Sequence, residues 1–274
     1  MRLGLHVSIA GRLTQAFKEG LESKSEALQI FSTSPRMWRS SVVSDQEAEN
    51  FRSERGDFYP LVVHASYLIN LGSKNEEVRK KSVHALKEEV ERSKKLGADY
   101  LVLHPGGGHQ NATAFIGESL SEILDYADGL RILLENVAGE GTKIGKNFYE
   151  LQEIIKRTAN GKRLGICFDT CHAFAAGYDL RKKETWQELQ KEIEETVGLE
   201  QVVLLHLNDC KGELGSRLDR HANWQDGYLG KVTIENLREN SFFSTLPGIL
   251  ETPGDLQQRT QDLQLCREWL GLDG

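Results

Sequence analysis

The segment Leu164-Gly-Ile-Cys-Phe-Asp169 is a short apolar run that ends on a carboxylate. Five more runs of this kind end on His, Glu or Asp, and they span residues 60–64, 99–104, 131–135, 202–206 and 248–251. Continuous apolar runs of this length are typical of strands buried on both faces, as in a parallel sheet covered by helices. A polar residue at the carboxyl end of one strand after another is how a (β/α)8 barrel builds its active site. The repeated pattern therefore predicts a metal-binding site at the mouth of a barrel.

The rest of the chain supplies the alternating elements that a barrel needs. Two more apolar runs, at residues 2–8 and 27–32, bring the expected strands to eight. Helical patterns are expected between them, as βα units require, at residues 12–22, 45–55, 75–96, 113–128, 147–159, 184–196, 232–240 and 256–270. The length of 274 residues suits one barrel, which typically takes about 250. We therefore expect one α/β domain over residues 1–274, a (β/α)8 (TIM) barrel with its active site in the loops at the C-terminal face.

Composition excludes few classes of function. The formal net charge is −7 and the sequence pI is near 5.7, so overall charge gives no sign of a nucleic-acid partner. Local fields steer association, however, and bound cations invert the local charge, so an anionic substrate at one face stays compatible with this total. No stretch approaches the roughly 20 apolar residues of a membrane span, and no secretory apolar region is seen. The four cysteines have no C-x-x-C spacing and are expected to be reduced and packed. Reduced cysteines and the lack of a secretory or membrane-spanning stretch together suggest a cytoplasmic protein.

Further candidate ligands lie in the loops that follow the strands. Asp169-Thr-Cys-His172 adds a second histidine just beyond the sixth strand, and Asp219-Arg-His221 places two ligands at i and i+2, which point the same way in an extended segment. The full candidate set is His64, His104, Glu135, Asp169, His172, His206, Asp219, His221 and Glu251. This set exceeds what one ion needs, and sharing of some ligands would allow three ions. Imidazole and carboxylate ligands without thiolate suit zinc or manganese.

The remaining histidines and glycine-rich stretches carry weaker signals. A single histidine at a strand end is more often structural than a ligand, so the prediction rests on the agreement of all six strand ends. His6 is expected to support a ligand, whereas His84 and His109 are expected to be solvated. The stretch from Gly139 to Gly145 lacks G-x-G-x-x-G spacing, residues 106–108 lack the Lys-Ser/Thr of a P-loop, and no G-x-S-x-G occurs. A nucleotide cofactor is therefore not expected.

Three clustered divalent ions favour phosphodiester hydrolysis over redox chemistry. Such ions can generate hydroxide near neutral pH, neutralise phosphate oxygens and stabilise a leaving alkoxide. Aromatic and basic residues also occur in loops that follow the strands, at Arg36, Trp38, Arg39, Tyr67 (followed by Leu68), Lys211, Arg217 and Arg220. Arginine and aromatic side chains on exposed loops can contact backbone phosphates and wedge into a base stack. A DNA substrate is consistent with this set.

Several longer stretches resemble the endonuclease IV family of apurinic/apyrimidinic (AP) endonucleases, over nearly the whole chain. They are His64-Ala-Ser-Tyr-Leu-Ile-Asn-Leu-Gly72, Leu103-His-Pro-Gly106, Glu135-Asn136, Asp169-Thr-Cys-His-Ala-Phe-Ala-Ala-Gly-Tyr-Asp179, His206-Leu-Asn-Asp209, Gly215-Ser-Arg-Leu-Asp-Arg-His221 and Leu250-Glu-Thr252. The stretch from Asp169 to Asp179 is highly specific, whereas short ones such as Leu-Glu-Thr are not. The resemblance implies a DNA-repair enzyme that cuts duplex DNA on the 5′ side of an abasic nucleotide, leaving a 3′-hydroxyl and a 5′-deoxyribose phosphate.

The resemblance also implies roles for the candidate ligands. Three zinc ions are expected, with Mn²⁺ as an alternative at one site. The first ion would be bound by His64, His104 and Glu135, the second by Glu135, Asp169, His206 and Glu251, and the third by His172, Asp219 and His221. The two catalytic residues would be Glu135, which bridges two ions, and Glu251, which helps to position a metal-bridging hydroxide that acts as the nucleophile.

The DNA-contacting residues implied by the resemblance are Arg36, Tyr67 and Leu68. They match residues that penetrate the DNA stack and hold the abasic nucleotide outside the helix. Two positions depart from the family pattern. Trp224-Gln225 stands where relatives have a glycine-containing loop after Asp-Arg-His, and Ser34 stands where many have Asn. We expect the first departure to alter the loop beside His221 and the second to alter the DNA-penetrating loop. A monomer is expected.

Two other functions remain as alternatives. Glu135, Asp169, His206 and Glu251 alone would make a one-metal site like that of sugar isomerases and epimerases of the xylose-isomerase-like superfamily, whose two Glu carboxylates exchange a proton with the sugar. Such an enzyme has no need for the other five ligands. A non-enzymatic binder of damaged DNA, with turnover lost through the Trp224-Gln225 loop, is the second alternative. Bound metal with affinity for abasic DNA but no cleavage would support it.

Overall fold

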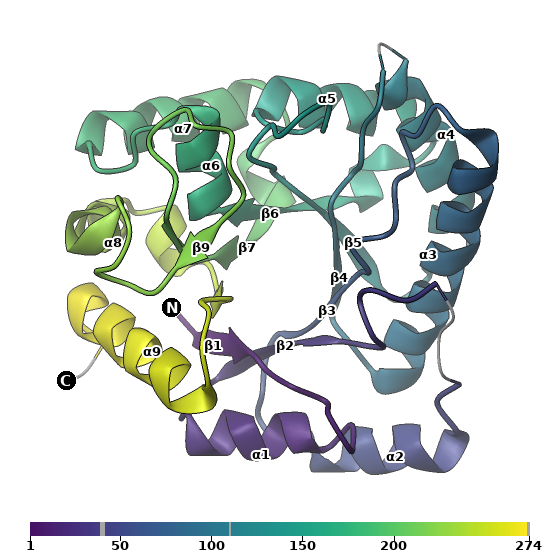
Figure 1. The fold of residues 1–274 in the computed structure, drawn as a ribbon, viewed down its shortest axis with the longest axis horizontal. Helices are drawn as coiled ribbons and strands as arrows, with labels where there is room; N and C mark the ends of the chain where they lie inside the picture. Colours follow the sequence, from purple (N-terminus) through teal and green to yellow (C-terminus); the bar gives the residue numbers. More distant parts are fainter. Residues whose placement is uncertain (39–41, 110, 273–274) are drawn as a thin grey trace.

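Eight parallel strands close into a barrel in the computed structural model, which describes residues 1–38, 42–109 and 111–272 (Figure 1). Around the barrel the strands follow the order β1-β10-β7-β6-β5-β4-β3-β2. Their bounds are β1 (Leu3–His6), β2 (Ala27–Phe31), β3 (Leu61–His64), β4 (Tyr100–Leu103), β5 (Arg131–Glu135), β6 (Gly165–Asp169), β7 (Val202–His206) and β10 (Gly248–Leu250). The expected TIM barrel is confirmed, with each strand inside the range predicted for it. Arg39, a candidate DNA contact, lies outside the described residues.

Helices form a ring around the barrel and cover its outer face (Figure 1). Their bounds are α1 (Gln15–Glu22), α2 (Asp45–Glu54), α3 (Glu76–Leu96), α4 (Ala112–Leu124), α5 (Phe148–Arg157), α7 (Lys183–Glu195), α8 (Gly230–Glu239) and α9 (Leu256–Leu270), with 3-10 turns η1 (Gly161–Arg163), η2 (Leu199–Gln201) and η3 (Phe243–Thr245). Each predicted helix is present, with small shifts at its ends. Within the described ranges, every helix is too short or too polar to cross a bilayer.

Three short elements at the carboxyl ends of the strands were not expected. Helix α6 (Thr170–Ala176) begins directly after β6, and the Asp169 side chain caps it by accepting a hydrogen bond from the backbone N–H of His172 at 2.7 Å. The strands β8 (Asp209–Cys210) and β9 (His221–Ala222) pair antiparallel and form a hairpin. These elements carry His172 and His221, so they turn loop residues that the sequence placed only approximately into rigid parts of the mouth.

The barrel interior is filled by one apolar residue from each of seven strands. These fully buried residues are Ala27, Val62, Val102, Leu133, Cys167, Leu204 and Ile249. A larger apolar core lies between the strands and the surrounding helices and includes Phe17 and Phe51. All four cysteines are free and buried, as predicted. Because alternate residues of a strand point to the same side, the residue two positions beyond each interior residue also points into the barrel, towards its mouth.

Candidate metal centre

A layer of polar side chains lies directly above the apolar interior layer, two residues further along each strand. Its members on these seven strands or just past their ends are Gln29, His64, His104, Glu135, Asp169, His206 and Glu251. Six of the seven are the strand-end ligands predicted from the sequence, and the structure brings all six to the floor of the mouth. Gln29 was not predicted. The signal that could have found it is its place, two residues after Ala27, as the one polar residue of an otherwise apolar run.

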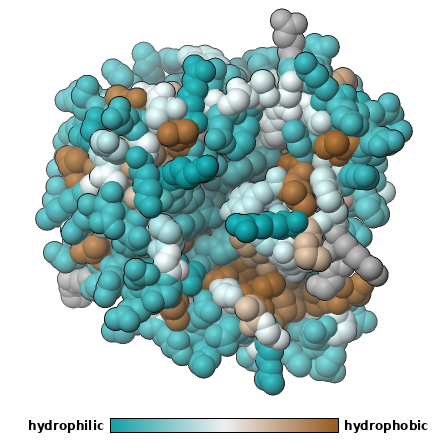
Figure 2. Space-filling view, in the orientation of Figure 1, coloured by the Kyte–Doolittle hydropathy of each residue, from teal (hydrophilic) through white to brown (hydrophobic). Residues whose placement is uncertain are grey.

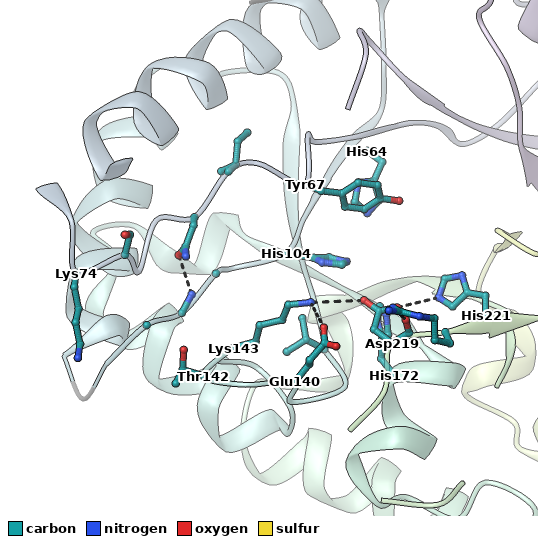
Figure 3. Close-up of a pocket in the computed structure, with 18 of the residues that line it drawn as sticks. His64, Tyr67, Lys74, His104, Glu140, Thr142, Lys143, His172, Asp219 and His221 are labelled. Atoms are coloured by element: carbon teal, nitrogen blue, oxygen red, sulfur yellow. Dashed lines mark hydrogen bonds and ion pairs between the residues drawn. The ribbon is translucent and has the colours of Figure 1, made fainter. Parts of the chain in front are cut away.

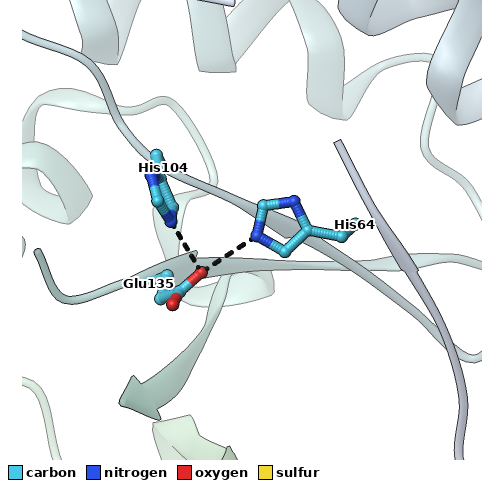
Figure 4. A group of neighbouring side chains, drawn as sticks. All are labelled: His64, His104 and Glu135. Carbon is cyan, nitrogen blue, oxygen red and sulfur yellow. Dashed lines mark hydrogen bonds and ion pairs between the residues drawn. The ribbon is translucent and has the colours of Figure 1, made fainter. Parts of the chain in front are cut away.

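The first set of side chains is His64, His104 and Glu135, which converge on one another (Figure 4). The Nε2 atoms of His64 and His104 lie 3.2 and 3.0 Å from the same carboxylate oxygen, Oε2 of Glu135. On the far side of its ring, His64 Nδ1 lies 2.8 Å from the carbonyl oxygen of Ala65. A carbonyl only accepts, so Nδ1 carries the proton of a neutral His64 and the Nε2 lone pair faces the carboxylate. Two acceptors at this distance require a proton or a cation between them.

The second set is Glu135, Asp169, His206 and Glu251, and it shares Glu135 with the first. The Nδ1 atom of His206 lies 3.1 Å from one oxygen of Glu135 and 3.1 Å from one oxygen of Glu251. Asn208, which sequence reasoning missed, donates its amide N–H to Asp169 Oδ2 at 2.7 Å and accepts the backbone N–H of Glu251 at 2.8 Å. These bonds orient two of the three carboxylates.

The third set is Asp169, His172 and His221. The resemblance implied Asp219 in place of Asp169. Asp219 lies beside this set, with Oδ1 3.1 Å from Nε2 of His172 and 3.9 Å from Nε2 of His221 (Figure 3). Its second oxygen lies 3.8 Å from the ammonium group of Lys143, which also pairs with Glu140 at 3.3 Å. All nine predicted ligands are therefore brought to one mouth, eight of them in three neighbouring sets and Asp219 beside the third.

Protonation in the absence of metal follows from this crowding of opposite charges. Burial alone would lower the pKa of His172 and of His206, but neighbouring groups outweigh it and raise both well above 6.5; these are carboxylates for His172, and Cys167 together with Glu251 and Glu135 for His206. Burial alone would raise the pKa of Glu135 and of Glu251, but the surrounding histidines outweigh it and lower both well below 4.5. Protons on the histidines thus hold the carboxylates together, in positions where a divalent cation can replace them.

The donor atoms fit divalent ions. The ligand atoms of each set lie within 4.8 Å of one another, close to the roughly 4 Å span of two ligands bonded to one ion at about 2.0–2.2 Å. The buried Nε2 atoms of His172 and His221 have no hydrogen-bond partner among the described residues. His172 Nδ1 lies 2.9 Å from the carbonyl oxygen of Asn136, so a neutral ring keeps its proton on Nδ1 and turns the lone pair of Nε2 towards Asp219. Because the set contains no thiolate, zinc or manganese suits it better than a soft metal.

A cavity of about 710 Å³ opens above the three sets and is hollowed into the face shown in Figure 2. The metal-binding candidates lie at one end of it, Lys74 lines the other end, and the ammonium group of Lys143 reaches from the wall towards Asp219 (Figure 3). Polar side chains predominate around the hollow in Figure 2. The cavity therefore pairs a strongly ionic floor with a wall that carries two ammonium groups, which suits a phosphorylated ligand.

The predicted DNA-contacting residues lie beside this cavity. Tyr67 is 56 % exposed, and its ring centre lies 5.4 Å from that of His64. Leu68 is half-buried and Arg36 is exposed. The loops that carry them are joined, because the Ser66 hydroxyl donates to the carbonyl oxygen of Pro35 at 2.8 Å. The structure brings the three residues to adjoining loops of one mouth, and their contact with DNA stays a prediction.

The loop after His221, in which Trp224 and Gln225 depart from the family's sequence pattern, is well packed. Trp224 is buried and meets Trp269 edge-on, with ring centres 6.0 Å apart. Gln225 adopts a φ of 85°, the left-handed region that glycine favours, so the loop keeps a glycine-like backbone without a glycine. Asp209 fixes the same loop by accepting the backbone N–H of Leu229 at 2.8 Å.

The histidines left out of the metal set have three different environments. His6 contacts a ligand as expected, with Nδ1 3.4 Å from Glu251 Oε1. His84 is solvated as predicted, with 77 % of its side chain exposed. The prediction for His109 is wrong, because its ring is half-buried and lies 5.0 Å from that of Phe115. The loop residue is held there by packing against α4, which a sequence pattern does not reveal.

Comparison with known proteins places this centre in a family. Residues 18–270 match the family model of the xylose isomerase-like TIM barrel. The chain is 42 % identical to a protein named probable endonuclease 4 from Halothermothrix orenii, covering 97 % of this chain and 98 % of that protein. The endonuclease IV structure from Thermus thermophilus superposes with a TM-score of 0.89 at 37 % identity, over 99 % of this chain and 100 % of the other. The chain belongs to the endonuclease IV family. It is therefore a metal-dependent hydrolase of the AP endonuclease type.

The same barrel also occurs in proteins of other function. A D-tagatose 3-epimerase-like protein superposes with a TM-score of 0.75 at 23 % identity, over 99 % of this chain and 98 % of the other. At that identity the likeness shows the shared fold alone. Beside the four-residue set of Glu135, Asp169, His206 and Glu251, the described part of this chain has two further histidine-containing sets.

Proposed function

We propose that this member of the endonuclease IV family hydrolyses the phosphodiester on the 5′ side of an abasic nucleotide in duplex DNA. The products would be a 3′-hydroxyl and a 5′-deoxyribose phosphate. The observation that carries the proposal is the clustering of eight His, Asp and Glu side chains into three adjoining sets, with Asp219 beside the third, at the floor of one cavity. Three ions, zinc at all or manganese at one, would be held by these sets.

Bound there, the ions would make water acidic enough to attack near neutral pH and would offset charge on the phosphate and the leaving oxygen. The chain's own residues provide the alignment. Glu135 lies between the first two sets, and Glu251, held through its backbone by Asn208, faces the second set. Lys74 lines the far end of the cavity and Lys143 reaches towards Asp219 beside the third set, and both would pair with phosphates that flank the cut.

Selection of the lesion would depend on the two joined loops beside the cavity. Arg36, Tyr67 and Leu68 would enter the base stack and hold the abasic nucleotide out of the duplex. An abasic nucleotide has no base to unpair, so rotating it out costs less than rotating out a normal nucleotide. The exposed ring of Tyr67 leans over His64 at the edge of the first set, where it would stack against the flipped nucleotide or its neighbour.

The experiment that tests the proposal combines metal content with incision. We expect elemental analysis of the purified chain to give about three ions. On a labelled duplex with one abasic site, we expect a single nick on the 5′ side of the lesion. The matched duplex without the lesion serves as control. One ion per chain, no nick and turnover of a ketose would refute the nuclease and favour an epimerase. Abasic-DNA binding without a nick would identify a non-catalytic binder.

We further propose that the enzyme acts as a monomer in the cytoplasm, which gel filtration and cell fractionation would test.

A further inference from the structure

Gln29 is a fully buried amide in the middle of β2, and neither the ligand set nor the DNA-contacting loops account for it. It makes three contacts. Its Nε2 atom lies 2.6 Å from Oε1 of Glu251 and 2.9 Å from Nδ1 of His6. Its Oε1 atom lies 2.9 Å from Nε2 of His206. The amide thus joins a strand without a ligand to two residues of the second set.

The orientation of this amide follows from chemistry. The short contact between Gln29 and Glu251 is a hydrogen bond to a carboxylate oxygen, which acts as the acceptor. The atom beside it must therefore be the donating –NH2 of Gln29. The carbonyl oxygen of Gln29 then faces His206, and an oxygen requires a proton on the nitrogen that it meets. His206 must carry its proton on Nε2, which leaves the lone pair of a neutral ring on Nδ1.

That lone pair points at the second set. Nδ1 of His206 lies 3.1 Å from an oxygen of Glu135 and 3.1 Å from Oε2 of Glu251. The other neutral tautomer would aim an N–H at the place of an ion and leave the Gln29 carbonyl facing a bare nitrogen. The same amide holds Oε1 of Glu251 back, so that Oε2 is the oxygen left to face the set.

We propose that Gln29 is a positioning residue of the second set, which selects the metal-binding tautomer of His206 and directs Glu251 towards the same ion. The inference rests on the proposed metal site. His6 completes the arrangement by accepting the second N–H of the amide, and its own ring lies 4.4 Å from that of Phe31. The backbone carbonyl of His6 in turn accepts from Arg259 of α9 at 2.6 Å. Gln29 is therefore held from both sides and cannot easily rotate.

The test replaces Gln29 by methionine, which keeps the length of the side chain and removes both its donor and its acceptor. Ile30→Val is the matched control, since Ile30 is equally buried on the same strand but packs in the outer core. Zinc binding of the full chain is measured by competition with a chromogenic chelator, without DNA. We expect Gln29→Met to weaken one of the three zinc sites by about 10- to 100-fold and Ile30→Val to leave all three unchanged.

A second measurement uses the zinc-loaded wild-type chain and does not depend on the folding of any variant. Nitrogen-15 NMR of labelled histidines should show His206 with its proton on Nε2 and zinc on Nδ1. Zinc on Nε2 would overturn the inference, as would a folded Gln29→Met chain with unchanged zinc affinity. Weaker zinc binding in Gln29→Met, in a chain that cuts no abasic DNA, would support this inference and refute only the proposed reaction.

Discussion

The His172→Ala substitution tests the third metal set separately from the other two. This substitution removes His172 from the third set and leaves Asp169 and His221, with Asp219 beside them. Every side chain of the first two sets is kept. Structural zinc sites bind with roughly 10–16 kcal/mol over about four ligands, or about 3 kcal/mol per ligand. At about 1.4 kcal/mol per tenfold change, one lost ligand weakens that site by about 100-fold. We therefore expect two tightly held ions in place of three.

The assay is elemental analysis after dialysis against a chelator that strips only the weakened site, followed by incision of abasic duplex. We expect cleavage to fall by about 100-fold or more, because one of the three divalent ions around the phosphate would be lost. His84→Ala is the control, since it removes an exposed imidazole on α3 far from the mouth. Circular dichroism confirms that the barrel persists. Three ions and full activity in His172→Ala would refute the assignment of the third set.

Backbone strain, protonation and DNA contact each give one further expectation. Gln225→Gly should relieve the left-handed φ of 85°, stabilise the chain by about 1 kcal/mol and raise Tm by about 2–4 °C in calorimetry, and an unchanged or lower Tm would contradict this. In the metal-free chain the pKa values of His172 and His206 are raised, so protonation of these rings stabilises the fold below pH 6.5. This contribution is lost as the pH rises through their folded-state pKa values. A free energy of unfolding in urea that increases above pH 6.5 would contradict this expectation. Arg36→Ala and Tyr67→Ala should each weaken binding to abasic duplex by about 1–3 kcal/mol in fluorescence anisotropy, and Arg36→Ala alone should reduce the salt slope by about 1, so equal slopes would exclude a phosphate contact.

The fold could be predicted because its signal is repeated eight times. Each strand is too short to identify alone, but apolar runs such as residues 131–135 and 202–206, which match β5 and β7 residue for residue, recur with helical patterns between them. The six strand-end ligands follow from the same repetition. Alternation along the strand fixes which residue points inward, so a polar residue two positions past a buried one must face the mouth.

Residues outside this repetition were the ones missed. Helix α6 has only seven residues, and the β8–β9 hairpin pairs only two residues on each side, so neither has enough length for a periodic pattern. Gln29 was hidden because its run contains no ionisable residue. Asn208 acts through hydrogen bonds to Asp169 and Glu251, which come from other strands. Contacts of this kind depend on how strands are aligned side by side, which a pattern read along one strand cannot specify.

The second set also affects how slowly the folded chain unfolds. Its members Glu135 and Glu251 are 116 residues apart in sequence, and they come together only when β10 is paired beside β7, β6 and β5. An ion that needs both carboxylates has little to bind in a partly folded chain. Metal should therefore leave the rate of folding almost unchanged and slow the rate of unfolding. The centre that performs the chemistry would then also set the half-life of the enzyme at high temperature.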